Sequence, residues 1–270
     1  MAKIYHYTTI DTLALIMLNK TIRFNRLDLV DDKEETLYSS GPYDTKICKN
    51  VFVSCWTRDP IENHDLWKRY TKGYRGVRIA LDEDMFITYE INDHFKSYFR
   101  EWNTIIEDCV FPLPLNEAKL NDVRYVYNNE HYIKNAIRND GNYIHISIQE
   151  LGLYKRKNKW EQQAESRFKL FCYPTTPEIL KIIQSNNINV KLSAWEDINS
   201  LLFSNHQINL EYYDMPLKKD ALDSIEVMMG PATSDDDRDK VKRILFPCPI
   251  SRIISKRKII NSKILTVTTN

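Results

Sequence analysis

The sequence is poor in glycine, cysteine and histidine, and each shortage excludes a class of site. Its 6 glycines form neither a G-x-G-x-x-G pattern nor a P-loop, which removes the main sequence support for a Rossmann or P-loop nucleotide site. The five cysteines are scattered and form no C-x-x-C pair, so we expect reduced thiols rather than disulfides or structural zinc. The six histidines show no H-E-x-x-H spacing, and we expect no metal ion.

Long apolar runs and an excess of one charge are missing as well. No run approaches the roughly 18–20 apolar residues of a membrane span, and the first residues lack the apolar segment of a signal peptide. We therefore expect a cytoplasmic protein without a membrane partner. Lys and Arg number 38 against 37 Asp and Glu, so no global field attracts nucleic acid. With 43% hydrophobic residues in 270, the composition is that of a globular protein.

The order of the expected elements predicts one mixed domain. Strands are expected at residues 4–7, 21–24, 51–56, 76–81, 123–127, 165–173, 225–229 and 264–268. Helices are expected at residues 10–18, 62–70, 83–108, 129–153 and, capped by Ser234, 234–245. Residues 175–222 are interpreted as an insertion. Because strands and helices alternate irregularly, a single α+β domain over residues 1–270 is favoured over a doubly wound parallel sheet.

The first candidate site lies where the opening strand meets the first helix. His6, Tyr7 and Thr8 stand at this junction, where a histidine and a hydroxyl group can hold a ribose or a phosphate. The helix N-terminus behind them favours an anionic group. The alternative is structural: His6 packs in the core and Thr8 caps the helix.

The second candidate combines the strand that contains Ser54 and Cys55 with the helix that follows it. Trp67 and Tyr70 are three residues apart and share a helix face, where they can stack on a planar ring such as nicotinamide or adenine. The alternative is an aromatic core. Cys55 has no visible partner for a nucleophilic role.

The third candidate is the segment Gln163–Arg167. In an extended chain, Gln163, Glu165 and Arg167 project to one face. A carboxylate and an amide on one strand can address two ends of a polar substrate, and a cation such as Arg167 keeps Glu165 ionised. The alternative is an exposed ion pair of little consequence.

Two basic runs, Lys155–Lys159 and Arg252–Lys258, are the best arguments for nucleic-acid binding. Both are short and lie in a nearly neutral chain, where such runs are usually solvated loops. The loop Gly230–Ser234 is interpreted as an ordinary strand–turn–helix connection.

In their order, these segments resemble a bacterial family catalogued as domain of unknown function 2971. The likeness rests on Tyr5–Thr8, Thr21–Asn25, Asp32 with Glu35, Val53–Thr57, and later segments of the chain. The later segments are Leu66–Tyr70, Gly76–Ile79, Trp160 with Gln163–Arg167, and Ile225–Pro231.

The same segments are similar, more weakly, to the ADP-ribosyltransferase superfamily. That likeness implies an α+β fold with a split or strongly bent antiparallel or mixed sheet flanked by helices. It implies NAD as substrate, no metal ion, Glu165 as the catalytic residue and Gln163 as the contact to the acceptor. The residues that would bind NAD are His6, Tyr7, Thr8, Ser54, Trp67, Tyr70 and Arg167. The middle Ser-Thr-Ser element of one branch is absent, and Ser54–Thr57 is the nearest segment.

The sequence thus predicts an NAD-consuming enzyme, an ADP-ribosyltransferase or an NAD glycohydrolase. A bacterial toxin or defence effector that modifies a macromolecule, nucleic acid or protein, fits this chemistry. The rival hypothesis is a non-catalytic module of a bacterial stress or defence system that binds nucleic acid or protein.

Overall fold

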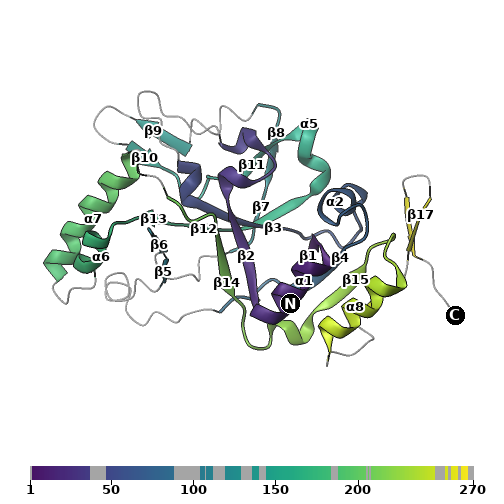
Figure 1. Cartoon of the computed structure of the whole chain (residues 1–270). Helices are drawn as coiled ribbons and strands as arrows, with labels where there is room; N and C mark the ends of the chain where they lie inside the picture. Colours follow the sequence, from purple (N-terminus) through teal and green to yellow (C-terminus); the bar gives the residue numbers. More distant parts are fainter. Residues whose placement is uncertain are drawn as a thin grey trace.

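The computed structural model describes most of the chain as strands and short helices. The described residues are 2–36, 47–87, 104–106, 108–111, 119–128, 136–139, 144–183, 188–204, 206, 208–246, 253–254, 257–260 and 263–266. Within them the fold is mixed α+β with a large, mainly antiparallel sheet (Figure 1). In this part of the chain, no helix has both the length and the apolar character needed to cross a membrane.

One nine-stranded sheet organises the molecule. In spatial order, its path contains β14 (Tyr212–Pro216), β2 (Thr21–Arg26), β3 (Val51–Thr57), β1 (Lys3–Thr8), β4 (Val77–Asp82), β15 (Glu226–Met229) and β16 (Ile253–Ile254). Off this path, β12 (Glu165–Phe171) pairs with β3, and β7 (Asn121–Asp122) pairs with β12. Every pairing in this sheet is antiparallel except that of β15 with β16.

The sheet splits along one edge of β3. Strand β12 pairs with the whole length of β3, from Val51 to Thr57. On the other edge, β2 pairs only with Phe52 and Val53, and β1 pairs only with Thr57. Between these positions, neither β1 nor β2 pairs with β3. The backbone of residues 54–56 therefore faces an opening between two diverging strands.

Helix α1 (Ile10–Asn19) connects the two strands that border this opening. Thr9 caps the helix, since its hydroxyl group accepts a hydrogen bond of 3.1 Å from the backbone N–H of Thr12. Its residues Leu13 and Ile16, about one turn apart on the same face, are buried. The helix ends at Lys20 in a left-handed conformation (φ 54°), and β2 starts at the next residue. The strand–helix–strand order predicted for residues 4–24 is confirmed.

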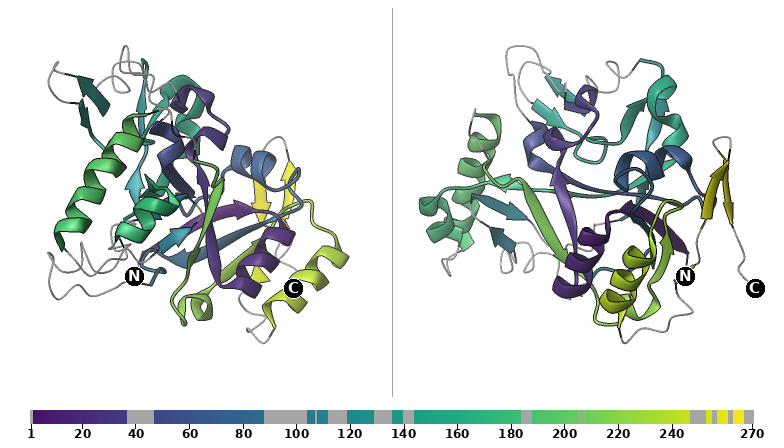
Figure 2. Two further views of the ribbon diagram at one scale, coloured as in Figure 1. Left: turned by 60° about the vertical axis from the view of Figure 1, so that its left-hand side comes forward. Right: turned by 45° about the vertical axis from the view of Figure 1, so that its right-hand side comes forward.

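The half of the sheet formed by β1, β4 and β15 is covered by two adjacent helices. Helix α8 (Asp235–Leu245) contacts α1, and Figure 2 shows the two side by side in both views. Ser234 and Asp237 form a capping box, in which each side chain accepts a hydrogen bond from the other residue's backbone N–H. Val241 and Leu245 are buried against the main core.

Smaller elements surround the other half. Strands β5 (Thr104–Ile106), β6 (Cys109–Phe111) and β13 (Tyr173–Pro174) form a three-stranded sheet, against which α6 (Pro177–Ile183) and α7 (Ile188–Phe203) pack. The remaining strand pairs are β8 (Arg124–Val126) with β11 (Tyr154–Arg156), β9 (Ile137–Asn139) with β10 (Ile144–Ile146), and β17 (Arg257–Ile260) with β18 (Lys263–Thr266). Two further helices are α2 (His64–Tyr70), which contacts β1, and α5 (Lys157–Trp160), which contacts β8 and β11 (Figure 1). The predicted insertion contributes β14 to the main sheet.

Two predicted helices are wrong where the structure describes them. Residues 104–106 of the expected helix 83–108 form β5, and residues 88–103 lie outside the described part. The expected helix 129–153 contains β9 and β10. In β10 and after it, Ile144, Ile146 and Ile148 alternate with polar residues, a period of two that is typical of a strand. The described cysteines, Cys48, Cys55, Cys109 and Cys172, are free thiols.

A close backbone approach beside β1 gives a first testable prediction. A Cβ atom on Gly76 would lie 2.2 Å from the carbonyl oxygen of Thr8 and 2.7 Å from the Cβ of Thr71. Gly76→Ala is therefore expected to lower the free energy of unfolding by about 1–3 kcal/mol or more, because backbone must move. The measurement is urea unfolding of the variant.

Gly73 provides the control for this substitution. It is left-handed (φ +69°), and a Cβ atom added to it would have no neighbour within 4 Å. Asparagine tolerates this conformation, so Gly73→Asn is expected to change stability by less than about 0.5 kcal/mol. Equal stabilities of the two variants would contradict the steric argument.

Candidate active site

The split in the sheet opens into a cavity of about 460 Å³. Its wall contains residues of β1, α1, β2, β3, α2 and β12, together with Lys155 of β11 and Gln163. The predicted residues that line it are His6, Tyr7, Thr8, Ser54, Tyr70, Gln163, Glu165 and Arg167. The fold thus brings the three predicted segments, which lie far apart in the sequence, to one cavity.

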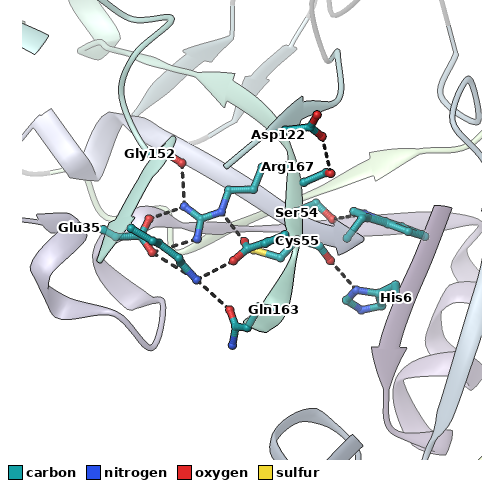
Figure 3. A network of polar contacts seen from close by, with 12 residues as sticks. His6, Glu35, Ser54, Cys55, Asp122, Gly152, Gln163 and Arg167 are labelled. Atoms are coloured by element: carbon teal, nitrogen blue, oxygen red, sulfur yellow. Dashed lines mark hydrogen bonds and ion pairs between the residues drawn. The ribbon is translucent and has the colours of Figure 1, made fainter. Parts of the chain in front are cut away.

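His6 is fixed by the unpaired edge of β3. Its Nδ1 atom lies 2.8 Å from the carbonyl oxygen of Cys55, which can only accept a hydrogen bond (Figure 3). Burial lowers the pKa of His6, against the smaller raising effect of this hydrogen bond. A neutral ring that donates through Nδ1 has an unprotonated Nε2 atom, so His6 is able to accept a hydrogen bond from a bound hydroxyl group.

Glu165 is held by two cations inside the protein. Its Oε2 atom lies 2.6 Å from the Nζ atom of Lys155, and its Oε1 atom accepts a hydrogen bond from the Nε atom of Arg167. Burial is the largest single effect and raises the pKa of Glu165, but the two cations outweigh it and hold this pKa at about 2. Glu165 is therefore ionised at every physiological pH.

A second carboxylate completes the group. Glu35, in a 3₁₀ helix (Lys33–Thr36), accepts hydrogen bonds from both terminal nitrogens of Arg167 and lies 3.5 Å from the Nζ atom of Lys155. The carbonyl oxygen of Gly152 accepts a further hydrogen bond of 2.7 Å from Arg167. Two carboxylates face two cations, and all four side chains are buried. Burial raises the pKa of Glu35, against the lowering effect of Arg167 and Lys155, and the buried carboxylate of Asp32 lies near the same two cations. Figure 3 shows Glu35 on the far side of Arg167 from Cys55.

Gln163 connects this group to the aromatic wall. It ends a 3₁₀ helix (Glu161–Gln163) just before β12, and its amide oxygen lies 3.2 Å from the Nζ atom of Lys155. Its amide nitrogen donates a hydrogen bond of 3.2 Å to the hydroxyl group of Tyr70. Burial raises the pKa of Tyr70, so its phenol stays protonated. The Tyr70 ring at the cavity wall is thereby fixed in position.

Two residues that were predicted to bind NAD, Trp67 and Arg167, have their side chains in the protein interior. Trp67 does not line the cavity: it is fully buried, it packs edge-on against Tyr7, and its indole N–H donates to Glu62. The aromatic-core interpretation therefore describes Trp67. Arg167 borders the cavity, but its side chain is completely buried and bonded to Glu35, Glu165 and Gly152, which leaves it no access to a cofactor in this arrangement.

The remaining predicted residues line the cavity in more limited roles. The hydroxyl group of Tyr7 accepts a hydrogen bond of 3.0 Å from the backbone N–H of Asn63, the N-cap residue of α2. The hydroxyl group of Ser54 accepts one of 3.0 Å from the indole N–H of Trp56. Thr8 is buried next to the start of α1.

Sequence reasoning missed the parts played by Glu35 and Lys155. In the sequence, Glu35 belongs to an acidic turn and Lys155 opens a basic run, and neither pattern indicates burial. A usable signal was Arg167 itself: it belongs to an expected strand with Phe168, Leu170 and Phe171, and an arginine that is buried in such a strand requires a counter-charge. Cys55 lies in the same wall opposite Arg167, and burial strongly raises the pKa of its thiol, so it is not an activated nucleophile.

Each cation of the basic run 155–159 pairs with a nearby carboxylate. Lys155 is buried against Glu165, Arg156 and Lys159 both pair with Glu34, and Lys157 pairs with Glu161. This segment is therefore not a free basic patch. The second run, Arg252–Lys258, lies partly outside the described residues.

Comparisons with known proteins add nothing to this geometry. No family model matches the chain, and no curated protein or solved structure matches it. The resemblances drawn from the motifs therefore stay predictions. Within the described part of the chain, no group of three or more His, Cys, Asp or Glu side chains is arranged to hold a metal ion.

Proposed function

We propose that the protein consumes NAD, as an ADP-ribosyltransferase or as an NAD glycohydrolase. The observation that carries the proposal is the meeting of His6, Tyr70 and Glu165 on one cavity at a split in the sheet. A volume of about 460 Å³ lies within the usual range of roughly 300–1,000 Å³ for ligand sites. An ionised carboxylate, a neutral histidine and an aromatic ring are the groups this reaction requires.

The proposed chemistry is cleavage of the bond between nicotinamide and ribose. The bond's electron pair goes to the nicotinamide nitrogen, and positive charge develops on the ribose carbon. A carboxylate at the ribose 2′-hydroxyl stabilises this oxocarbenium-like state, as in glycoside hydrolysis. Water or a hydroxyl or amide group of an acceptor then bonds to the carbon and releases its proton, whereas an ionised carboxylate acceptor bonds to the carbon without releasing one.

The cavity residues divide these tasks. Glu165 would bond to the 2′-hydroxyl, His6 would accept a hydrogen bond from a ribose hydroxyl, and Tyr70 would stack on the nicotinamide ring. Gln163, next to Glu165, would contact the acceptor. Thr8, Thr9 and Thr12 line the cavity at the start of α1, where the helix dipole favours the diphosphate.

The rival hypothesis is a module that binds nucleic acid or protein, and it rests on the basic runs 155–159 and Arg252–Lys258 and on the 16 tyrosines. The first of these supports is weakened, because the cations of the run 155–159 all have carboxylate partners. A near-neutral chain with such a run lacks the electrostatic footprint of nucleic-acid binding.

The direct test incubates the purified protein with NAD labelled in the adenylate part, alone and with cell lysate. We expect nicotinamide release, with transfer of label to a macromolecule for a transferase or free ADP-ribose for a hydrolase. Calorimetric titration measures NAD affinity separately. Absence of both heat and nicotinamide release, together with a salt-dependent gel shift on nucleic acid, would support the rival function.

Tyr70 and Trp67 form a matched pair for the ligand-binding part of this proposal. Both are aromatic residues of α2, but only Tyr70 lines the cavity. Tyr70→Ala is expected to weaken NAD binding by about 1–3 kcal/mol, or roughly 5- to 150-fold, because a stacking surface is lost. Trp67→Phe is expected to lower the melting temperature while leaving NAD affinity unchanged. Equal effects of both on NAD affinity would contradict the assigned roles.

A further inference from the structure

The four buried charges form a closed ring in which each group contacts two of opposite sign. Glu165 contacts Arg167 and Lys155, and so does Glu35 on the other side. The relative exposure of these residues is 0% for Arg167, 1% for Glu35, 4% for Lys155 and 6% for Glu165. Glu165, Lys155 and Arg167 border the cavity, whereas Glu35 does not.

Stability alone gives little reason for this ring. Desolvating a buried charge costs several kcal/mol, and apolar residues of similar volume are often as stable or more stable than a buried ion pair. The neighbouring positions show that this part of the sheet packs apolar residues well: Val51 and Val53, on the same face of β3 as Cys55, are 2% and 1% exposed. The ring therefore calls for a role other than holding the strands together.

We propose that Glu35 and Lys155 are positioning residues that, through and with Arg167, hold the carboxylate of Glu165 ionised and fixed in orientation at the cavity wall. Lys155 holds Oε2 directly. Glu35 acts indirectly. It fixes the guanidinium group of Arg167, which holds the Oε1 atom of Glu165, and it also lies beside the ammonium group of Lys155. This inference rests on the proposed function for the identity of the substrate, but not for the state of the carboxylate.

The geometry leaves Glu165 able to act. An ionised carboxylate offers about four lone-pair positions; the two cations occupy one on each oxygen, and the thiol of Cys55 is a third hydrogen-bond partner. The remaining position is available for a substrate hydroxyl group. A carboxylate held on both oxygens cannot rotate, so the arrangement is organised before the substrate binds, as catalysis by fixed charges requires.

Other titratable groups around Glu165 do not replace these cations. The groups that face it from the packed elements are Arg167 of β12, Lys155 of β11, Glu35 of the 3₁₀ helix, Cys55 of β3, Tyr125 of β8 and Tyr70 of α2. Burial raises the pKa values of the two tyrosines and the thiol, so they stay neutral. Lys155 and Arg167 are thus the cations that set the ionisation of Glu165.

Lys169 provides a matched control for Lys155. It lies on β12, two residues from Arg167, and its ammonium group is bonded to the carbonyl oxygens of Ile148, Gln149 and Leu151 at 2.7–3.3 Å. It touches neither Glu165 nor Glu35 by any hydrogen bond or ion pair that the structure shows among the described residues. Lys155→Met and Lys169→Met therefore remove the same group from two inward-facing sites that differ in their contact with Glu165.

The experiment measures the pKa of Glu165 by carboxyl NMR on protein labelled with ¹³C-glutamate, with the signal assigned by its loss in Glu165→Gln. In the wild type we expect a value of about 2. In Lys155→Met it should rise by about 1–3 units, the effect of losing an adjacent opposite charge. In Lys169→Met it should not move. A wild-type value of 4 or above, or equal shifts in the two variants, would overturn the proposal.

Activity provides a second, separable readout. The acidic limb of the NAD cleavage profile should move to higher pH in Lys155→Met by the same amount as the NMR pKa. Glu35→Gln should lower kcat by about 10- to 100-fold, because the carboxylate of Glu165 is then misplaced. NAD affinity should stay unchanged, because Glu35 itself does not line the cavity. Glu35→Asp should recover part of that loss. If the variants of Lys155 and Glu35 melt at a lower temperature but keep the wild-type kcat and pH profile, the role of these residues is purely structural and the proposal is overturned.

Failure of the two proposals is distinguishable. If the wild type cleaves no NAD, the proposed function fails, while the NMR titration still reports on Lys155 and Glu165. If NAD is cleaved but the titration does not respond to Lys155→Met, the positioning role fails and the proposed function stands.

Discussion

Glu165→Gln should lower the rate of nicotinamide release on the order of 10²–10³-fold, the usual cost of removing one group that stabilises transition-state charge. Glutamine keeps the size of the side chain but cannot provide a negative charge at the ribose. NAD binding should change much less, because most of the cavity wall is intact. The measurement compares kcat for nicotinamide release with the dissociation constant from calorimetry.

This substitution has a structural side effect that needs its own control. It leaves Lys155 and Arg167 buried with Glu35 as the only carboxylate of the ring, an excess of one positive charge. The double variant Glu165→Gln with Lys155→Met restores neutrality and should be more stable than the single variant, yet equally inactive. Recovery of NAD cleavage in the double variant would show that charge imbalance, not the missing carboxylate, caused the loss.

Arg167→Met should produce the largest loss of stability, about 3–5 kcal/mol in the free energy of unfolding, the usual cost of breaking a buried ion pair. Arg167 is fully buried and makes hydrogen bonds to Glu35, Glu165 and Gly152. Its loss leaves two buried carboxylates with a single cation. Urea unfolding measures the change, and the melting temperature should fall in parallel.

An apolar replacement of the whole ring tests the physical reason. The variant Glu35→Leu, Lys155→Met, Glu165→Leu and Arg167→Met removes all four charges of the ring together, while the buried carboxylate of Asp32 keeps its hydrogen bond from the backbone N–H of Glu34. We expect it to recover most of the stability lost in Arg167→Met while cleaving no NAD. A quadruple variant no more stable than Arg167→Met would mean that the ring is itself a main source of stability.

Glu165 also makes stability depend on pH in a defined direction. Its pKa in the folded state, about 2, lies below the ordinary value of 4.5, so its contribution is fully present above the ordinary value. The contribution is lost as the pH falls from about 4.5 toward 2, because the unfolded chain binds the proton first.

Much of the local structure could be predicted from sequence. The segments around His6, Ser54, Tyr70 and Glu165 have strong periodicity or clear caps, and they fold as expected into β1, β3, α2 and β12. The shared face of Glu165 and Arg167 follows from the period of two in a strand, and the structure shows their direct contact. The helix at Ser234 was signalled by its cap.

The errors arose where the local signal was weak. In residues 129–153, some apolar residues recur at helical spacing, while the isoleucines alternate as in a strand. The pairing of β9 with β10 stabilises the strand conformation of these segments. The sequence pattern places Trp67 and Tyr70 on one helix face. In the structure, Trp67 packs against Tyr7 in the core, whereas Tyr70 lines the cavity.

The amino-acid sequence by itself determined which segments become strands and helices and which side chains share a face, because these depend on neighbours a few residues apart. Only the tertiary structure decided that β1 and β2 separate along β3, and that Glu35 meets Arg167 across 132 positions of the chain. Both features depend on the register of strands distant in sequence, which no local pattern encodes. The cavity and the ring of charges at its wall are therefore products of the fold.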